Sequence, residues 1–221
     1  MTDQTGSRPP DSADTAGEAE LIAAQRLIFF SDAVVAIAIT LLALGLPTVT
    51  GSSEHQVLSS LRLNINAYLP FLISFVVIAG YWRVHHRLYQ HVGRLDSRLV
   101  TINMVWLLMI ICTPYVTRVL SGGNTFSAVR FSLYAVIQVI TIMTFVVMRR
   151  HIRDHDLLRA GATTSVTSAY DASFLAVAAA FTISIPIAFA VRSQWTYLVW
   201  VAAGFAGRAV RRRNDQRSEA G

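Results

Sequence analysis

Six long runs of apolar residues, separated by short polar segments, divide most of this chain. A helix needs about 20 residues to cross a bilayer, and runs of this length indicate transmembrane helices. We therefore expect an all-α, polytopic membrane protein with six transmembrane helices, at Leu27–Leu46, Ala67–Trp82, Leu99–Val116, Phe131–Met148, Ala172–Val191 and Trp195–Phe205. The last run is short and needs a snorkelling Arg208 to reach the interface.

Polar segments flank these runs on both sides. Residues 1–20 contain few apolar side chains, and we expect a disordered cytosolic tail because so little surface can be buried. Residues 21–207 form the expected six-helix transmembrane domain, and residues 208–221 form a basic cytosolic tail. The connections between the runs are too short for a separate domain, and they contain no P-loop or dinucleotide-binding glycine pattern.

Composition supports a membrane protein. Apolar residues make up 53% of the 221 residues and charged residues only 14%, against roughly 25% charged in soluble domains. The one cysteine, Cys112, excludes an intrachain disulfide and a thiolate zinc site. These values argue against a soluble enzyme, a secreted disulfide-rich module or a zinc finger.

The net charge of +6 comes from 19 basic residues, all arginine. With six spans, 15 arginines lie on the side of both termini and four lie on the other, namely Arg62, Arg118, Arg130 and Arg192. Positive residues stay on the cytoplasmic side, so we expect both termini in the cytoplasm. The positive charge thus indicates the topology of the chain and gives no support for nucleic-acid binding. The arginines of residues 208–217 give at most weak support for binding of anionic lipid.

The first run begins with a charged motif, Arg26-Leu-Ile-Phe-Phe30-Ser31-Asp32. An acid within a membrane helix is costly and commonly functional. Asp32 also lies near the beginning of the expected span, where the helix dipole favours an acid. The residues alone leave both interpretations open.

Arg26-x-x-x-Phe30-Ser31-Asp32, together with Trp82-Arg-Val-His85-His86-Arg-Leu-Tyr89 and with Asn103 ahead of Pro114-Tyr115, resembles the transmembrane protein 175 family of potassium channels. The resemblance covers about Arg26 to Thr117 and one six-helix unit, as in prokaryotic members. It implies a homotetramer in which four first helices surround a central pore that has no carbonyl-lined filter. We accordingly expect a passive, potassium-preferring cation channel of the cytoplasmic membrane.

The first helix carries the candidate pore residues. At 100° per residue, Ile37, Leu41 and Leu44 fall within about 60° of each other, with Thr40 on the flank. Such stripes usually pack against other helices, but the resemblance implies that these positions constrict the pore. Rings of branched apolar side chains gate by dewetting, and the Thr40 hydroxyl would be the polar layer that meets a cation.

The remaining polar residues of the motifs form a second expected group. We assign Arg26, Phe30, Ser31 and Asp32 to a network that holds the first helix, with His85 and Asn103 as candidate partners. We read the other cytosolic histidines, among them His86 and His151, as solvated and interfacial, because five are too few for a di-iron site.

We expect no enzyme activity, metal or cofactor, with potassium as the permeant ion and other monovalent cations and membrane lipid as contacts. The alternative is a proton-permeable or proton-coupled transporter in which Asp32 and His85 relay protons.

Overall fold

Five of the six apolar runs form long helices. The computed structural model describes residues 12–123, 125–159, 165–196 and 198–200. Its elements are α1 (Ser12–Ala43), α2 (Glu54–Leu63), α3 (Ile65–Gln90), α4 (Ser97–Ser121), α5 (Ala128–Asp154), α6 (Ser165–Val191) and a short 3-10 turn, η1 (Gln194–Thr196). The described part of the chain contains no strand, so the all-α expectation is confirmed there.

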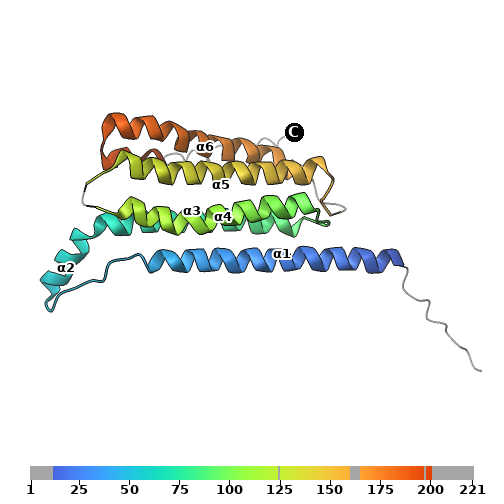
Figure 1. Cartoon of the computed structure of the whole chain (residues 1–221), viewed down its shortest axis with the longest axis horizontal. Coiled ribbons are helices and arrows are strands. Elements are labelled where there is room, and N and C mark those ends of the chain that lie inside the picture. The colour runs from blue at the N-terminus through green and yellow to red at the C-terminus, as the bar shows by residue number, and fades with distance from the viewer. Residues whose placement is uncertain (1–11, 124, 160–164, 197, 201–221) are drawn as a thin grey trace, which may run out of the picture.

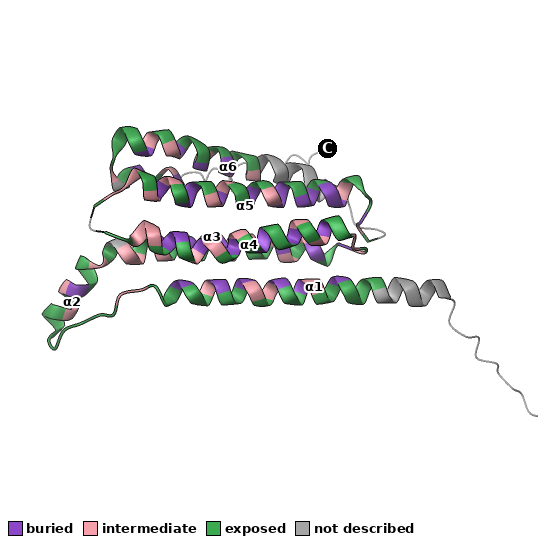
Figure 2. Cartoon of the chain, viewed as in Figure 1, coloured by how far each residue is buried: buried purple, intermediate pink, exposed green. Residues whose placement is uncertain are grey.

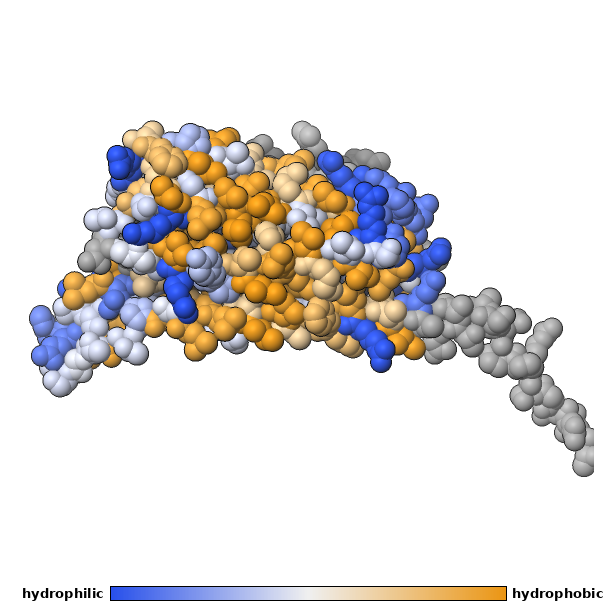
Figure 3. Space-filling model, in the orientation of Figure 1, coloured by the Kyte–Doolittle hydropathy of each residue, from blue (hydrophilic) through white to orange (hydrophobic). Residues whose placement is uncertain are grey.

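Each long helix contains a stretch apolar and long enough to cross a membrane: mean hydropathy is between 1.5 and 2.3 in all five. Most of the sixth predicted span, Trp195–Phe205, lies outside the described residues. Six spans with both termini on one side therefore stay a prediction. Figure 3 shows the matching surface, an apolar band across the middle of the bundle with hydrophilic residues gathered towards its two ends.

The helices pack in an order that puts α1 at one edge of the bundle (Figure 1). α1 contacts both α3 and α4, α4 contacts α5, and α5 contacts α6. We refer to the end that carries α2 as the α2 end, and to the opposite end, where α3 stops and α4 begins, as the Asp96 end.

Two segments differ from the sequence-based expectation. Helix α1 begins at Ser12, inside the tail expected to be disordered over residues 1–20. Ala13, Ala16 and Ala19 are strong helix formers, and extending an existing helix costs far less than nucleating one. Helix α2 lies in a connection for which no helix was expected; the Ser53 side chain caps it by accepting from the Gln56 N–H at 3.4 Å.

At the Asp96 end, one carboxylate ties two helices together. Asp96 Oδ1 accepts from the Leu99 N–H at 2.6 Å and caps α4, while Oδ2 lies 2.7 Å from His151 Nε2 on α5. The His151 side chain is only 5% exposed, and its ring lies 4.1 Å from that of His155. His151 is therefore buried and paired, and our reading of it as a solvated residue was wrong.

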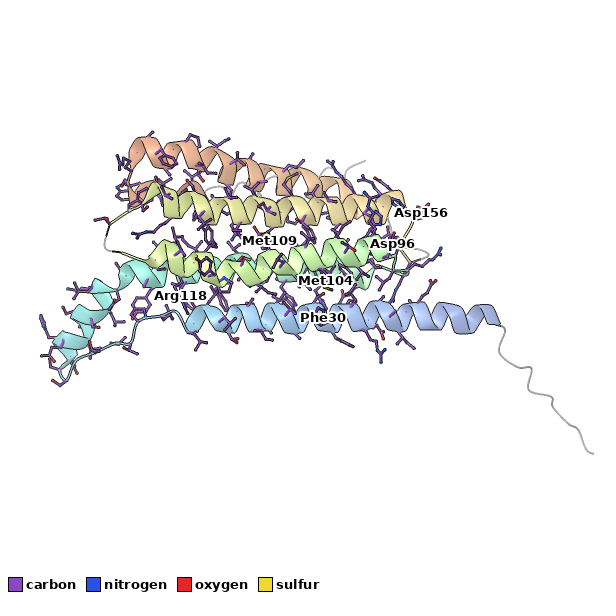
Figure 4. The ribbon with its side chains drawn as sticks, in the orientation of Figure 1. Phe30, Asp96, Met104, Met109, Arg118 and Asp156 are labelled. Atoms are coloured by element: carbon purple, nitrogen blue, oxygen red, sulfur yellow. The ribbon has the colours of Figure 1, made fainter. Side chains whose placement is uncertain are left out.

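Backbone hydrogen bonds reinforce this connection. Val92 and Leu158 form an isolated antiparallel bridge, in which the Gly93 N–H donates to the Leu157 carbonyl at 2.9 Å and the Arg159 N–H donates to the His91 carbonyl at 2.9 Å. The segment between α3 and α4 is thus joined to the chain that leaves α5. Asp96 and Asp156 are both labelled at this end in Figure 4.

We expect Asp96→Ala to lower the free energy of unfolding by about 0.5–2 kcal/mol, the usual cost of losing an N-cap. Asp96→Asn should cost less because asparagine also caps helices. Partial desolvation raises the pKa of Asp96, but the Leu99 N–H and His151 outweigh it, so the pKa lies below its ordinary value.

A lowered folded-state pKa means that the ionised carboxylate stabilises the fold above its ordinary pKa, and that this stabilisation is lost as pH falls through the lowered value. The difference between wild type and Asp96→Asn, measured by thermal unfolding in detergent, should therefore shrink on acidification. Asp154→Asn, an exposed acid at the same end, is the control. A difference that does not change with pH would contradict the role of the charge.

Candidate functional site

Helix α1 has two faces of different character. Residues spaced three or four apart are buried against α3 and α4, and they include Ile28, Ser31, Val35, Ala38 and Leu42. This is the spacing of one face of an α-helix. Figure 2 shows these buried positions alternating with exposed ones along α1.

The four candidate pore residues lie on the exposed side. Ile37 is 58% exposed, Leu41 41% and Leu44 74%, and Thr40 is also exposed. The single chain leaves this side of the helix uncovered although its side chains are mostly apolar. Such a surface in a membrane helix is available to lipid, to another copy of the chain or to a pore.

Thr40 is the polar member of this exposed side. Its hydroxyl donates to the Ile37 carbonyl at 2.8 Å, one turn back along the same helix. The hydroxyl hydrogen is therefore used within α1, and the oxygen keeps lone pairs that can accept. An oxygen with this arrangement suits a cation.

On the buried face, three side chains from three helices form a hydrogen-bonded chain. The Asn103 amide nitrogen on α4 donates to Ser31 Oγ on α1 at 3.0 Å, and His85 Nε2 on α3 lies 2.8 Å from Asn103 Oδ1. An amide oxygen only accepts, so Nε2 must carry the imidazole proton and donate. All three side chains are at most 1% exposed, so they hold α1 against α3 and α4 without contact with solvent.

Aromatic rings fix the orientation of His85. Its ring stacks on Trp106 with centroids 4.2 Å apart and planes 8° apart, and on Tyr89 with centroids 4.5 Å apart. The imidazole is thus held between two rings, which leaves it little freedom to turn away from Asn103. This packing holds His85 in contact with Asn103, which in turn contacts α1 through Ser31.

Asp32 belongs to a separate and partly exposed group. Trp82 Nε1 donates to Asp32 Oδ1 at 2.8 Å, and His86 Nδ1 lies 3.2 Å from Asp32 Oδ2. Gln90 donates to His86 Nε2 at 3.0 Å, so Nδ1 carries the proton of the neutral ring and donates to the carboxylate. The side chains of His86 and Asp32 are 32% and 26% exposed.

The structure therefore divides the expected network. His85 and Asn103 pair with Ser31, whereas Asp32 pairs with Trp82 and His86; His86 is not the merely solvated residue that we expected. Trp82, His86 and Gln90 are spaced by four, which places them on one helix face and was the signal that sequence reasoning missed.

Two residues of the motif lie outside both groups. Arg26 is exposed and makes no side-chain hydrogen bond or ion pair within the described residues. Phe30 is 51% exposed. Both residues point away from the buried face because of their position around the helix. Relative to Ser31, Phe30 is rotated by about 100° and Arg26 by about 140°.

Comparison with known proteins bears on this same region. The sequence model of a family described as the endosomal/lysosomal potassium channel TMEM175 matches residues 26–114. This segment contains every candidate residue discussed above, from Arg26 to Asn103.

A protein from Streptomyces collinus named as a potassium channel is 28% identical over 130 residues, which are 58% of this chain and 63% of that protein. The human protein named as the endosomal/lysosomal proton channel TMEM175 is 31% identical over 114 residues, which are 51% of this chain and 23% of the human one. The chain thus spans less than two thirds of the length of either relative.

A solved structure covers more of the chain. The crystal structure of a homolog from Chamaesiphon minutus, described as that of a lysosomal potassium-selective channel TMEM175 homolog, is 27% identical and superposes with a TM-score of 0.59. The superposition covers 82% of this chain and 98% of that one.

We expect Asn103→Leu to lower the free energy of unfolding by about 1–2 kcal/mol, because it leaves Ser31 and His85 buried without their shared partner. The matched control is Thr101→Val, two residues away on the same helix, where the hydroxyl bonds only to the Ser97 carbonyl at an exposed position. Denaturant unfolding in detergent measures both. Equal stability of Asn103→Leu and wild type would show that the buried chain does not hold α1.

Proposed function

Because this chain belongs to the TMEM175 family of ion channels, we propose that it is a passive, potassium-preferring cation channel. The observation that carries the proposal is the exposed side of α1, where Ile37, Leu41 and Leu44 are uncovered in the single chain and Thr40 offers an oxygen. In this proposal the apolar side chains form a hydrophobic constriction, which takes the place of a carbonyl filter.

The proposed assembly is a homotetramer. Four copies of α1 around one axis would turn Ile37, Leu41 and Leu44 towards a shared pore and cover a face that a single copy exposes. Small residues at Ala33 and Ala36, also exposed, allow neighbouring helices to approach closely.

We further propose that the protein lies in the cell membrane with the Asp96 end and both termini facing the cytoplasm. Arg83, Arg87, Arg94, Arg98 and Arg150 are exposed near this end of α3, α4 and α5. That distribution follows the positive-inside rule.

In the proposed mechanism the buried chain of Ser31, Asn103 and His85 positions α1 and does not meet the ion. These side chains use their hydrogen-bonding groups on each other, on the buried face, to which the exposed candidate pore residues do not belong. Permeation would then depend on the exposed face, and its geometry on the buried one.

A proton-permeable or proton-coupled transporter is the second candidate. One observation favours it: the human relative is named as a proton channel. The partly exposed pair of Asp32 and His86 supplies groups that can exchange protons, whereas His85 is held between Asn103 and two rings.

A flux assay in liposomes separates the two. Light scattering first establishes whether four chains assemble, and potassium-loaded liposomes are then diluted into sodium medium with a pH-sensitive dye outside. A potassium channel makes the interior negative, so protons enter when a protonophore is added. With valinomycin added to set the potential, proton uptake without the protonophore would favour the second candidate. No potassium-driven signal with the protonophore, and no proton uptake with valinomycin, would exclude both.

Ile37→Asn tests the constriction. A polar amide in place of the apolar ring should favour water in the pore, so we expect potassium flux to rise several-fold and the preference over sodium to fall. Ile183→Asn is a matched control, because Ile183 on α6 is 57% exposed and Ile37 is 58% exposed. Flux that is equal in Ile37→Asn, Ile183→Asn and wild type would argue against a pore along this face of α1.

A further inference from the structure

A cavity at the α2 end points to a second site, beside the C-terminal end of the candidate pore helix. It has a volume of about 200 Å³ and lies between the C-terminal end of α1, the beginning of α3 and the last turns of α4. Most of its wall is apolar, including Leu42, Leu46, Phe71 and Ile111. From these residues and from Arg118 we propose that the cavity binds an anionic phospholipid, with an acyl chain inside and the phosphate on the guanidinium.

Arg118 supplies the charge at the cavity. It is the charged residue of the lining, and its Nε lies 3.5 Å from the position that a Cβ atom on Gly45 would occupy, so the side chain folds over the end of α1. Figure 4 shows Arg118 between α4 and α1.

Among the described residues, no carboxylate neutralises this arginine. Within the described residues Arg118 forms no ion pair, and of the acidic side chains described there only Glu54 belongs to the α2 end. Arg118 lies in a helix long and apolar enough to cross a membrane, where a cation is costly unless it reaches water or an anion. The Arg118 side chain is exposed, so its guanidinium is accessible to an anion from outside the chain.

The threonine and serine hydroxyls of the wall do not compete for that anion. Thr117 donates to the Thr113 carbonyl at 2.8 Å, and Ser121 donates to the Thr117 carbonyl at 2.9 Å. With those hydrogens used inside α4, the guanidinium is the strongest donor on the wall. An apolar cavity with one cation at its edge matches the chemistry of an anionic lipid.

The site also touches the candidate pore helix. Leu41 and Leu42 line the cavity, so a bound acyl chain would pack against the end of α1. Occupancy would therefore support the position of this end of the helix, which has no buried hydrogen-bonded chain of the kind found at Ser31. This step, unlike binding itself, rests on the proposed channel function.

Native mass spectrometry of the full-length protein in detergent tests binding. The protein is titrated with dioleoyl phosphatidylglycerol and, separately, with dioleoyl phosphatidylcholine. We expect Arg118→Gln to weaken phosphatidylglycerol binding about fivefold, the fold-change that corresponds to about 1 kcal/mol for one basic residue near an anionic headgroup. Phosphatidylcholine binding should not change, and Arg62→Gln, an exposed arginine on α2, should leave both lipids unaffected.

Ala67→Leu tests the acyl chain, because Ala67 lines the cavity and a larger side chain reduces its volume. We expect weaker binding of phosphatidylglycerol with Arg118 intact. Equal binding of the two lipids by wild type, or unchanged binding in Arg118→Gln or in Ala67→Leu, would overturn the proposal. A change in oligomeric state without a change in lipid binding would also overturn it, since the cavity would then be filled by a second copy.

Potassium flux in liposomes with and without phosphatidylglycerol tests the link to the pore. We expect phosphatidylglycerol to raise flux in wild type and not in Arg118→Gln. Selective binding with no effect on flux would overturn the link and leave the site intact. Selective binding in a protein that conducts nothing would count against the proposed function alone.

Discussion

Ser31, Asn103 and His85 meet where water does not reach, and their hydrogen bonds decide how α1 lies against α3 and α4. In a bilayer a polar group without a partner costs several kcal/mol, and lipid offers no replacement. Turning α1 by one residue would carry Ser31 about 100° away from Asn103 and expose the apolar residues that now pack beside it. This small polar contact therefore sets the rotation of the whole helix.

The fixed rotation divides α1 into an anchored side and an uncovered side. On the anchored side, packing of Val35 and Ala38 continues the contact begun at Ser31. The uncovered side repeats branched apolar residues with one hydroxyl among them, which is the surface that the proposed pore would use. The hydrogen bonds of the two sides do not cross the helix: Thr40 bonds to its own backbone, and Ser31 bonds to Asn103 and to the Leu27 carbonyl.

Much of this arrangement follows from the sequence. Hydropathy located the five helices that the structure describes, because crossing a bilayer requires long apolar runs. The motif residues indicated that the first helix carries the candidate site, but they did not indicate which side chains pair with each other. Ser31 and Asp32 are neighbours, as are His85 and His86, and adjacent residues on a helix point about 100° apart. Only the relative rotation of the packed helices, a tertiary property, decides that His85 turns inward and His86 turns towards Asp32.

The sequence-based prediction also missed helical segments outside the apolar runs. The cap at Ser53 and the alanines from Ala13 to Ala19 favour helix, yet the polar composition of both segments argued for loop or disorder. Composition measures how much surface can be buried, whereas helix formation beside an existing helix needs much less. The partnership of Asp96 with His151, 55 residues apart, could not be read from spacing at all.

The location of the buried contact has a mechanical consequence. Ser31 lies 13 residues before Leu44, which directly follows the last residue of α1, so the segment from this pivot to Leu44 is a lever about 20 Å long. A tilt of about 5° around Ser31 would move Leu44 sideways by about 1.7 Å, while Leu41, nearer the pivot, would move about 1.3 Å. The bore of a pore lined by this helix would therefore respond most strongly at the α2 end, far from the residues that hold the helix in place.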